Sequence, residues 1–271
     1  MKANIIKDHT LIIGELERSI KFNNLHSIFS FLPKGSYLVG GFIRNIILGR
    51  VTEELDIDIV VPLNAIEIGK KISDNIESKF IILDKKREVV RIILHDIYID
   101  IANQVSSTIE GDLSSRDFSI NSIAFLFDNK CLFDPLNGLK DIEFSLLRTY
   151  SETNLLIDPL RILRCLRFVS ELNFKIDLNL ITFIKKNKEK LYLVAKERIN
   201  YEIQKIVNVE NALKSLILLK KFNIFGPDSL YKDSFFLDLK KINFAQLNQH
   251  EKKKFLPLFF IAQILDEVSL R

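Results

Sequence analysis

The sequence predicts an α/β head, in which helices pack against a mixed sheet, followed by an all-α remainder. Segments whose apolar residues recur at every second position gather in the first part of the chain, and helical periodicity becomes almost continuous from Asp158 onward. At 271 residues the chain also exceeds the comfortable size of a single hydrophobic core. We therefore predict two modules, a head over residues 1–150 and a helical module over residues 151–271.

The head is expected to begin with a helix from Leu11 to Phe31, where apolar residues follow helical spacing and stop before Pro33. A strand at 36–39 then breaks at Gly40-Gly41 into a short helix at 42–48. The rest of the head alternates between apolar runs and charged or proline-containing breaks. The segments expected there are strands at 55–61, 80–83, 88–94 and 97–102 and a helix at 64–78.

The second module shows helical spacing and no convincing strand pattern. Short polar breaks separate the apolar stripes of its helices. The helices are expected at 158–173, 179–190, 196–208, 210–222 and 251–269.

Composition narrows the class of protein. Apolar residues make up 47% of the chain and charged residues 27%, which excludes wholesale disorder. No run of 18 apolar residues could span a membrane and the N-terminus lacks the regions of a signal peptide, so we expect a cytoplasmic protein without a membrane partner. The two cysteines, Cys131 and Cys165, lie far apart and indicate neither a disulfide framework nor a zinc site. No oligomeric state is predicted.

Charge is distributed unevenly along the chain. Residues 1–150 contain 18 Lys and Arg against 21 Asp and Glu, whereas residues 151–271 contain 21 against 14. A basic module beside an acidic one fits a protein that holds a polyanion with one part and does metal chemistry with the other. A lysine-rich surface without such a role would give the same counts.

Asp56 and Asp58 form the first candidate site. They stand two positions apart on the strand expected at 55–61, so their carboxylates project from the same face. Oxygen ligands gathered in this way suit Mg²⁺, which can bridge triphosphate oxygens and help to ionise an attacking hydroxyl group. Asp100 would supply a third carboxylate if the strand at 97–102 lies beside the strand at 55–61. The alternative is a strand face with solvated carboxylates.

Gly40 and Gly41 end a strand and open a helix. Bare backbone N–H groups can approach phosphate at such a turn, and a helix N-terminus favours anions. Arg44 stands one turn into the helix, where its guanidinium group could point at the same phosphates. The alternative is an ordinary tight turn.

Several ordered blocks of the sequence resemble one family, the class II tRNA nucleotidyltransferases and bacterial poly(A) polymerases of the polymerase-β-like nucleotidyltransferase superfamily. Three blocks in the head resemble the family's opening motif, metal-binding strand, and ribose and triphosphate motif; they read LVGGFIRNIILGR (38–50), LDIDIVV (55–61) and SRDFSINSIAF (115–125). Three more resemble its connecting motif, base-reading helix and neck helix; they read DPLNGLKDIE (134–143), DPLRILRCLRF (158–168) and ERINYEIQKI (197–206). The resemblance covers roughly residues 36–207 and implies the family's α/β head followed by a helical neck and body.

The resemblance also implies a role for residues in each block. In the head, Asp56 and Asp58 would hold the metal ions, with Asp100 as the third carboxylate. The nucleotide-binding residues implied there are Gly40, Gly41, Arg44 and Arg116 on the phosphates and Asp117 and Asn121 on the ribose side. Those implied in the second module are Asp158 and Arg161 on the base edge and Arg164 and Arg167 near the triphosphate.

The spacing of the helix expected from Asp158 supports this role independently. Arg161, Arg164 and Arg167 form one slowly turning row, and such arginines repel one another unless an anion or an acid lies against them. Asp and Arg together offer acceptors and donors that can imitate Watson–Crick hydrogen bonding, so a protein template could select ATP or CTP. The alternative is an arginine-rich exposed face over a core row formed by Leu160, Leu163 and Leu166.

Three positions depart from the family pattern. Asn45 stands where Asp is usual, Ser115 replaces the first of two arginines, and Ile157 replaces a common Glu. These changes spare the predicted metal-binding and base-reading residues and bear on the choice of nucleotide.

The function implied is template-independent transfer of CMP or AMP, from CTP or ATP, to a tRNA 3′ end, with Mg²⁺ as cofactor and pyrophosphate as the second product. Two alternatives stay open. A poly(A) polymerase would share every catalytic block and differ in RNA recognition, whereas an RNA-binding protein with a decayed active site would keep the fold alone. The intact Asp56 and Asp58 argue against decay.

Overall fold

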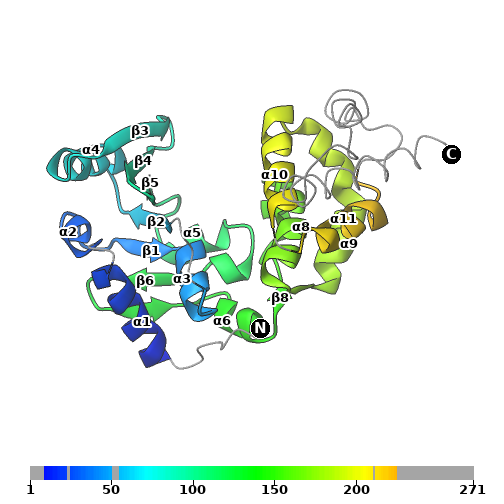
Figure 1. Cartoon of the computed structure of the whole chain (residues 1–271), viewed down its shortest axis with the longest axis horizontal. Coiled ribbons are helices and arrows are strands. Elements are labelled where there is room, and N and C mark those ends of the chain that lie inside the picture. Colours follow the sequence, from blue (N-terminus) through cyan, green and yellow to red (C-terminus); the bar gives the residue numbers. More distant parts are fainter. Residues whose placement is uncertain (1–8, 23–24, 51–54, 210, 225–271) are drawn as a thin grey trace, which may run out of the picture. The chain divides into compact units, whose positions relative to one another are not determined.

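A computed structural model describes residues 9–22, 25–50, 55–209 and 211–224. The chain divides into two compact units, residues 1–144 and residues 145–271 (Figure 1). The division precedes the boundary drawn from the sequence at residue 150, because residues 146–147 pair with residues 175–176 and so join the second unit. The helix expected at 251–269 lies outside the described residues.

A seven-stranded sheet forms the centre of the first unit (Figure 1). The strand order is β3-β4-β5-β2-β1-β6-β7; β2 and β5 are parallel, and the other neighbouring pairs are antiparallel. The mixed sheet predicted from the sequence is confirmed, but its last two strands were not expected. The strands are β1 (Tyr37–Val39), β2 (Leu55–Val61), β3 (Lys79–Asp84), β4 (Val89–Leu94), β5 (Ile97–Asn103), β6 (Ala124–Leu126) and β7 (Cys131–Phe133).

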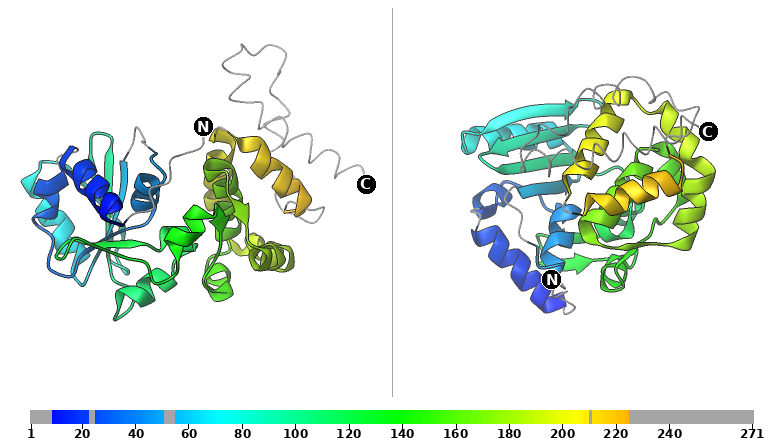
Figure 2. Two further views of the ribbon diagram at one scale, coloured as in Figure 1. Left: turned by 90° about the horizontal axis from the view of Figure 1, so that it is seen from below. Right: turned by 45° about the vertical axis from the view of Figure 1, so that its right-hand side comes forward.

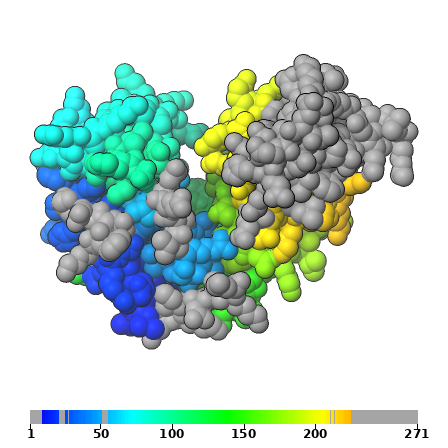
Figure 3. Space-filling model, in the orientation of Figure 1, coloured from blue at the N-terminus to red at the C-terminus, as the bar shows by residue number. Residues whose placement is uncertain are grey.

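Short helices surround this sheet. The single opening helix expected at 11–31 is described as two helices, with residues 23–24 outside the described residues. In the space-filling view, residues of α4 and β3 gather in cyan at one end of the first unit, and α1 lies in dark blue at the other (Figure 3). The helices are α1 (His9–Phe22), α2 (Leu25–Phe29), α3 (Gly41–Ile47), α4 (Ala65–Asn75), α5 (Ile109–Ser114) and α6 (Gly138–Glu143), with a 3₁₀ turn η1 (Ser119–Asn121).

The two faces of the sheet have different environments. On one face the isoleucines of β2 and β5, such as Ile57 and Ile99, are fully buried, and α4 packs on the same side. On the other face α5 covers a cluster that includes Val39, Val60 and Ala124. Farther along β2 on this second face, the Asp56 side chain is 82% exposed. The alternation of side chains along β2 therefore places Ile57 on the buried face and Asp56 and Asp58 on the opposite face.

The second unit consists mainly of helices, as predicted. Its α8 packs against α10 and α11 (Figures 1 and 2). One expectation is wrong, because a parallel pair of two-residue strands, β8 and β9, lies within this unit. The elements are β8 (Leu146–Leu147), α7 (Glu152–Ile157), α8 (Arg161–Leu172), β9 (Lys175–Ile176), α9 (Leu178–Asn187), the 3₁₀ turn η2 (Lys188–Leu193), α10 (Lys196–Asn208) and α11 (Ala212–Lys221).

The helix expected to begin at Asp158 begins later. Asp158 has extended backbone angles (φ −134°, ψ 90°) and separates α7 from α8, which starts at Arg161. Asp158 precedes Pro159, and the proline ring disfavours helical angles at the residue before it. Asp158 and Arg161 are therefore linked by a turn, in which the Arg161 N–H donates to the Asp158 carbonyl at 3.1 Å, and not by the face of one helix.

Candidate functional site

The predicted carboxylates lie on neighbouring strands. Asp58 of β2 is the register partner of Asp100 in the parallel strand β5, so the condition set for Asp100, that the two strands lie side by side, is met. Asp56 stands two positions earlier and projects from the same face. This arrangement brings three acidic residues to one part of the sheet.

Gly40 allows the backbone to approach Asp58 closely. Its φ of +80° lies in the left-handed region, where a side chain is rarely tolerated. A Cβ atom at this position would stand 2.6 Å from Oδ2 of Asp58 and 3.5 Å from Nη1 of Arg116. The glycine turn thus brings a carboxylate, a guanidinium group and bare backbone together.

Arg116 is fixed in this region by α5. Its Nε and Nη2 atoms donate to Oδ2 of Asp112, at 3.3 and 3.2 Å. Asp112 is buried and also accepts a hydrogen bond from the Val105 backbone N–H at 3.1 Å. The Arg116 side chain keeps 23% of its surface exposed, so its cationic group stands partly in solvent beside Gly40.

Three other predicted nucleotide-binding residues form a buried chain of hydrogen bonds. Nη1 of Arg44 donates to Oδ1 of Asn121 at 2.6 Å, and Nδ2 of Asn121 donates to Oδ1 of Asp117 at 3.0 Å. Asn45, which departs from the family pattern, accepts from both Nε and Nη2 of Arg44. These bonds tie α3 to η1. Gly41 lies against the same guanidinium group, since a Cβ there would stand 3.5 Å from Nη2 of Arg44.

Asp100 has a strong partner that the sequence analysis did not identify. Nε and Nη2 of Arg91, on β4, donate to the two carboxylate oxygens of Asp100 at 2.7 Å each. Arg91 also reaches to 4.0 Å from Oδ1 of Asp56. A two-residue turn at His95-Asp96 places residue 91 opposite residue 100, so the pairing could have been read from the sequence.

The residues present fit Mg²⁺ through a pair of carboxylates. Mg²⁺ commonly keeps several waters and takes one or two carboxylates together with substrate phosphates. Asp56 and Asp58 form such a pair, whereas a bidentate guanidinium partner already neutralises Asp100. Among the described residues, no cluster of three or more acidic, histidine or cysteine side chains is arranged to hold a metal.

In the second unit, Asp158 has one partner and one unsatisfied atom. Its Oδ2 accepts a hydrogen bond from Nη2 of Arg198, on α10, at 2.9 Å. Its Oδ1 is buried and has no hydrogen-bond partner among the described residues. A buried carboxylate oxygen without a partner is unfavourable, so a donor that reached this atom would stabilise it.

The arginines of α8 are half-buried and interact within their own unit. Nη1 of Arg161 donates to the backbone carbonyl of Asn154, on α7, at 3.0 Å, and the Arg164 guanidinium lies 5.7 Å from the centre of the Phe168 ring. Arg167 pairs with Glu171 and, through Nε at 2.6 Å, with the buried Glu202 of α10. Acidic side chains therefore lie against Arg167, as expected if they reduce the repulsion between the arginines of this row. Leu163 and Leu166 form the expected core row beneath.

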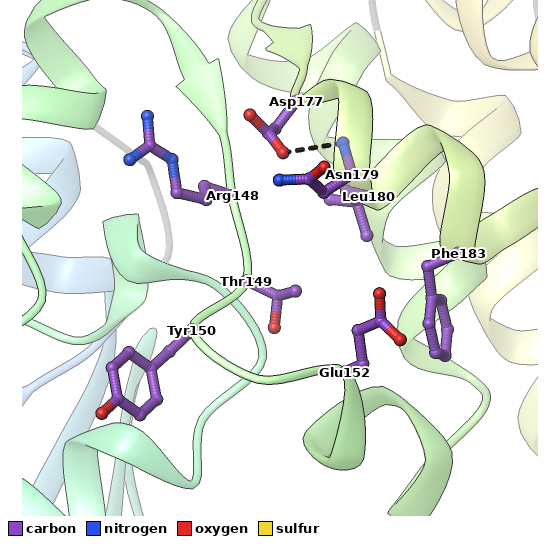
Figure 4. Close-up of a pocket in the computed structure, with 8 residues that line it drawn as sticks. All are labelled: Arg148, Thr149, Tyr150, Glu152, Asp177, Asn179, Leu180 and Phe183. Atoms are coloured by element: carbon purple, nitrogen blue, oxygen red, sulfur yellow. Dashed lines mark hydrogen bonds between the residues drawn. The ribbon is translucent and has the colours of Figure 1, made fainter.

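Two cavities, one within each unit, lie away from these residues. A cavity of about 470 Å³ in the first unit is lined by Tyr37, Thr108 and Phe133, among others. Burial and the neighbouring Glu110 raise the pKa of the Tyr37 phenol. A second cavity, of about 420 Å³, lies in the second unit, where Asp177 accepts a hydrogen bond from the Asn179 N–H (Figure 4). No predicted site residue lines either one.

Two further features bear on the class of protein. No described helix combines the length and the apolar character that a membrane crossing would need. Cys165 is buried and Cys131 is exposed, and they form no disulfide with each other.

Family models match both units. Residues 36–148 match the poly A polymerase head domain, and residues 173–227 match the probable RNA and SrmB-binding site of polymerase A. The first match includes Asp58 and Gly40, and the second includes β9 and α9 to α11. Each unit therefore has its own counterpart among known domains.

Known proteins of one kind resemble the chain. It is 35% identical over 190 residues to the CC-adding tRNA nucleotidyltransferase of Synechocystis sp.. The aligned region covers 70% of this chain and 44% of that protein. It is 30% identical over 205 residues to a CCA-adding enzyme of Staphylococcus aureus, covering 69% of this chain and 50% of the relative. The chain thus spans about half the length of these curated relatives.

A solved structure extends the similarity to almost all of the chain. The Thermotoga maritima CCA-adding enzyme complexed with tRNA_CCA matches with a TM-score of 0.74 and 27% identity. The match covers 99% of this chain and 70% of the other. The α/β head and the helical remainder therefore occur together in a known structure.

Proposed function

Because the chain belongs to the family of class II tRNA nucleotidyltransferases and bacterial poly(A) polymerases, we propose that it adds CMP, AMP or both to the 3′ end of a tRNA. The donors are CTP and ATP, and pyrophosphate is released. The reaction needs no nucleic-acid template, since the protein selects the base.

The arrangement around Asp58 carries this proposal. Asp56 and Asp58 share one face of β2, and Gly40 leaves room for the carboxylate of Asp58 against bare backbone and beside Arg116. Carboxylates and a cation side by side suit a metal-bound triphosphate, because each compensates charge of the opposite sign. A solvated strand face would not need a glycine in the left-handed region at this point.

Asp56 and Asp58 are the residues that we propose hold Mg²⁺. When bound, the ion supplies positive charge to the triphosphate and favours ionisation of the RNA 3′-hydroxyl. Arg116 binds phosphate oxygens from its position beside Gly40, and Arg44, Asn121 and Asp117 keep α3 and η1 in register around the site. Asp100 acts through Arg91, whose guanidinium it orients beside Asp56.

Base selection is assigned to Asp158 and Arg161. The amino group of adenine or cytosine is a donor that suits the free Oδ1 of Asp158, and the guanidinium of Arg161 is a donor that suits the ring nitrogen beside it. Guanine and uracil carry a carbonyl and an N–H at the same two positions. Their carbonyl would face the Asp158 carboxylate, acceptor against acceptor, and their N–H would face the Arg161 guanidinium, donor against donor. Arg164 contributes positive charge on the same helix.

RNA binding is assigned to the basic second module. Residues 151–271 contain 21 Lys and Arg against 14 Asp and Glu, and Lys185 and Lys186 stand in the last turn of α9. Contacts of this kind bind phosphates with little sequence preference and weaken as salt rises. We propose that the chain acts in the cytoplasm, because its proposed substrates are tRNA and nucleotides.

Incubation of the protein with defined RNAs tests the proposal. Transcripts of one tRNA that end at the discriminator nucleotide, at C or at CC are each supplied with a single labelled NTP and Mg²⁺. We expect CMP on the first two, AMP on the third, or one of these steps alone, with an Asp58→Ala variant as the inactive control. Long tails of A on any RNA end would support a poly(A) polymerase instead. No incorporation into any RNA would contradict both functions.

A further inference from the structure

Asp158, one of the two proposed base-reading residues, forms an ion pair with Arg198. It joins the turn before α8 to the first turn of α10. The Arg198 side chain is 53% exposed and the Asp158 side chain 27% exposed. Solvent therefore reaches the pair, and the cation is more accessible than the carboxylate that it contacts.

The contact involves only one of the two carboxylate oxygens. Nη2 of Arg198 lies 2.9 Å from Oδ2, while Oδ1 is buried without a partner among the described residues. A carboxylate held in this way has one oxygen without any hydrogen bond, Oδ1, and one oxygen whose acceptor capacity Arg198 already uses in part, Oδ2. The difference matters for recognition of a base, because two free oxygens can accept two parallel N–H bonds.

Guanine is the base for which this difference is largest. Its Watson–Crick edge presents two adjacent donors, the ring N–H and the exocyclic amino group, which match the two oxygens of an unoccupied carboxylate. Adenine and cytosine each present one amino group beside an unprotonated ring nitrogen. Uracil presents one N–H between two carbonyls. An unoccupied Asp158 would therefore favour the wrong purine.

We propose that Arg198 is a positioning residue that disfavours GTP, because it engages Oδ2 of Asp158 and leaves Oδ1 as the oxygen without a hydrogen bond that accepts from the amino group of adenine or cytosine. The inference rests on the proposed function, in which Asp158 reads the base. Arg198 acts through Asp158 and has no contact of its own with the base.

A structural role for Arg198 predicts a different result. If the pair only held α10 against α8, its loss would slow incorporation of every nucleotide by the same factor. Lys205 provides a matched control, since it stands on α10, lies over the Tyr201 ring at 4.5 Å and has no described contact with Asp158. Lys205→Met removes the same charge from the same helix.

The test measures kcat/KM for each of the four NTPs on a tRNA transcript that ends at CC. Arg198→Met should raise the ratio of GTP to ATP by about tenfold or more, the range expected for one good base contact, and should change the ratio of UTP to ATP less. Arg198→Lys should restore part of the discrimination, because one donor suffices for a single contact. Lys205→Met should keep the wild-type ratios. A transcript that ends at C, with CTP as the reference, serves in the same way if the chain adds only C.

A double-mutant cycle shows whether Arg198 acts through Asp158. In an Asp158→Ala background, Arg198→Met should have no further effect on the ratio of GTP to ATP. The inference is overturned if the ratio in Arg198→Met stays within about twofold of wild type, or if the full effect persists without Asp158. In both cases the wild type would still incorporate AMP or CMP. Absence of any incorporation by the wild type would instead overturn the proposed function and this inference together.

Discussion

The two sets of predicted site residues differ in what surrounds them. Asp56 of β2 has a largely exposed side chain on an open face of the sheet, with Gly40 shaped around its neighbour Asp58. On α8, by contrast, Arg161 and Arg167 are half-buried, and both interact with groups of their own unit. The position of a residue in a motif therefore does not say whether its side chain faces a ligand. Strand alternation settles the direction of Asp56 and Asp58, whereas the partners of the arginines depend on tertiary packing.

The largest expected effect is loss of the paired carboxylates. Asp58→Ala, or Asp56→Ala, should lower kcat by about a thousandfold or more, because a metal ligand acts on charge that develops in the transition state. Binding of tRNA should be nearly unchanged, since phosphate contacts supply most of that affinity. Incorporation of labelled nucleotide and a filter-binding assay measure the two quantities. Substantial turnover in both variants would contradict the proposal that Asp56 and Asp58 bind the metal ion.

Gly40→Ala should have the next largest effect. A Cβ atom 2.6 Å from Oδ2 of Asp58 must displace that carboxylate, and a displacement on the order of 1 Å can cost about a hundredfold in rate. Gly35→Ala is the matched control, because Gly35 has a similar φ of +78° and its added Cβ would meet only Pro62, at 3.5 Å. Both variants place an alanine at a φ near +80°. Equal rates for the two would show that Asp58 does not need this position.

A smaller effect is expected at Asp100. Since Arg91 occupies both of its oxygens, Asp100→Asn should lower incorporation by about tenfold, the usual effect of a group that orients a neighbour. Arg91→Met should have a similar effect. Titration with Mn²⁺, followed by electron paramagnetic resonance, should show little change in affinity for Asp100→Asn and a clear loss for Asp58→Ala. Equal losses of Mn²⁺ affinity in the two variants would indicate that Asp100 is a third metal ligand.

The smallest effect on catalysis is expected at Glu202. This buried residue pairs with Arg167, so Glu202→Gln should lower the free energy of unfolding by about 2 kcal/mol. Incorporation per folded molecule should change little, and for all nucleotides alike. Thermal unfolding measures the loss of stability, and kinetics at temperatures below the unfolding transition measure the activity of the folded variant. A stable but inactive variant would mean that Arg167 serves the triphosphate.

The sheet was predictable because local pattern determines most of it. Alternating Asp and branched apolar residues predict β2, and the turn at His95-Asp96 contains the information that pairs Arg91 with Asp100. Strands β6 and β7 were missed, since three residues are too few for a period to show and no Gly-Gly break marks them as Gly40-Gly41 marks β1. The start of α8 was placed too early because apolar spacing outweighed the effect of Pro159 on the residue before it.

The partners of charged side chains were less predictable. Asp158 and Arg198 are far apart in the sequence and meet only when α10 packs against α8, as do Arg167 and Glu202. Their spacing shows no period that links them. The motifs thus identified candidate residues, and the structure was needed to show which side chains form ion pairs and hydrogen bonds with them.

The division of work between the head and α8 is tested most directly by one comparison of kcat/KM values. ATP, CTP, GTP and UTP are each measured with wild type, Gly40→Ala and Arg161→Ala. We predict that Gly40→Ala slows every nucleotide by a similar factor, whereas Arg161→Ala lowers the preference for ATP and CTP over GTP and UTP by roughly 1–3 kcal/mol. An unchanged preference in Arg161→Ala, or a changed one in Gly40→Ala, would contradict the assignment of base selection to α8.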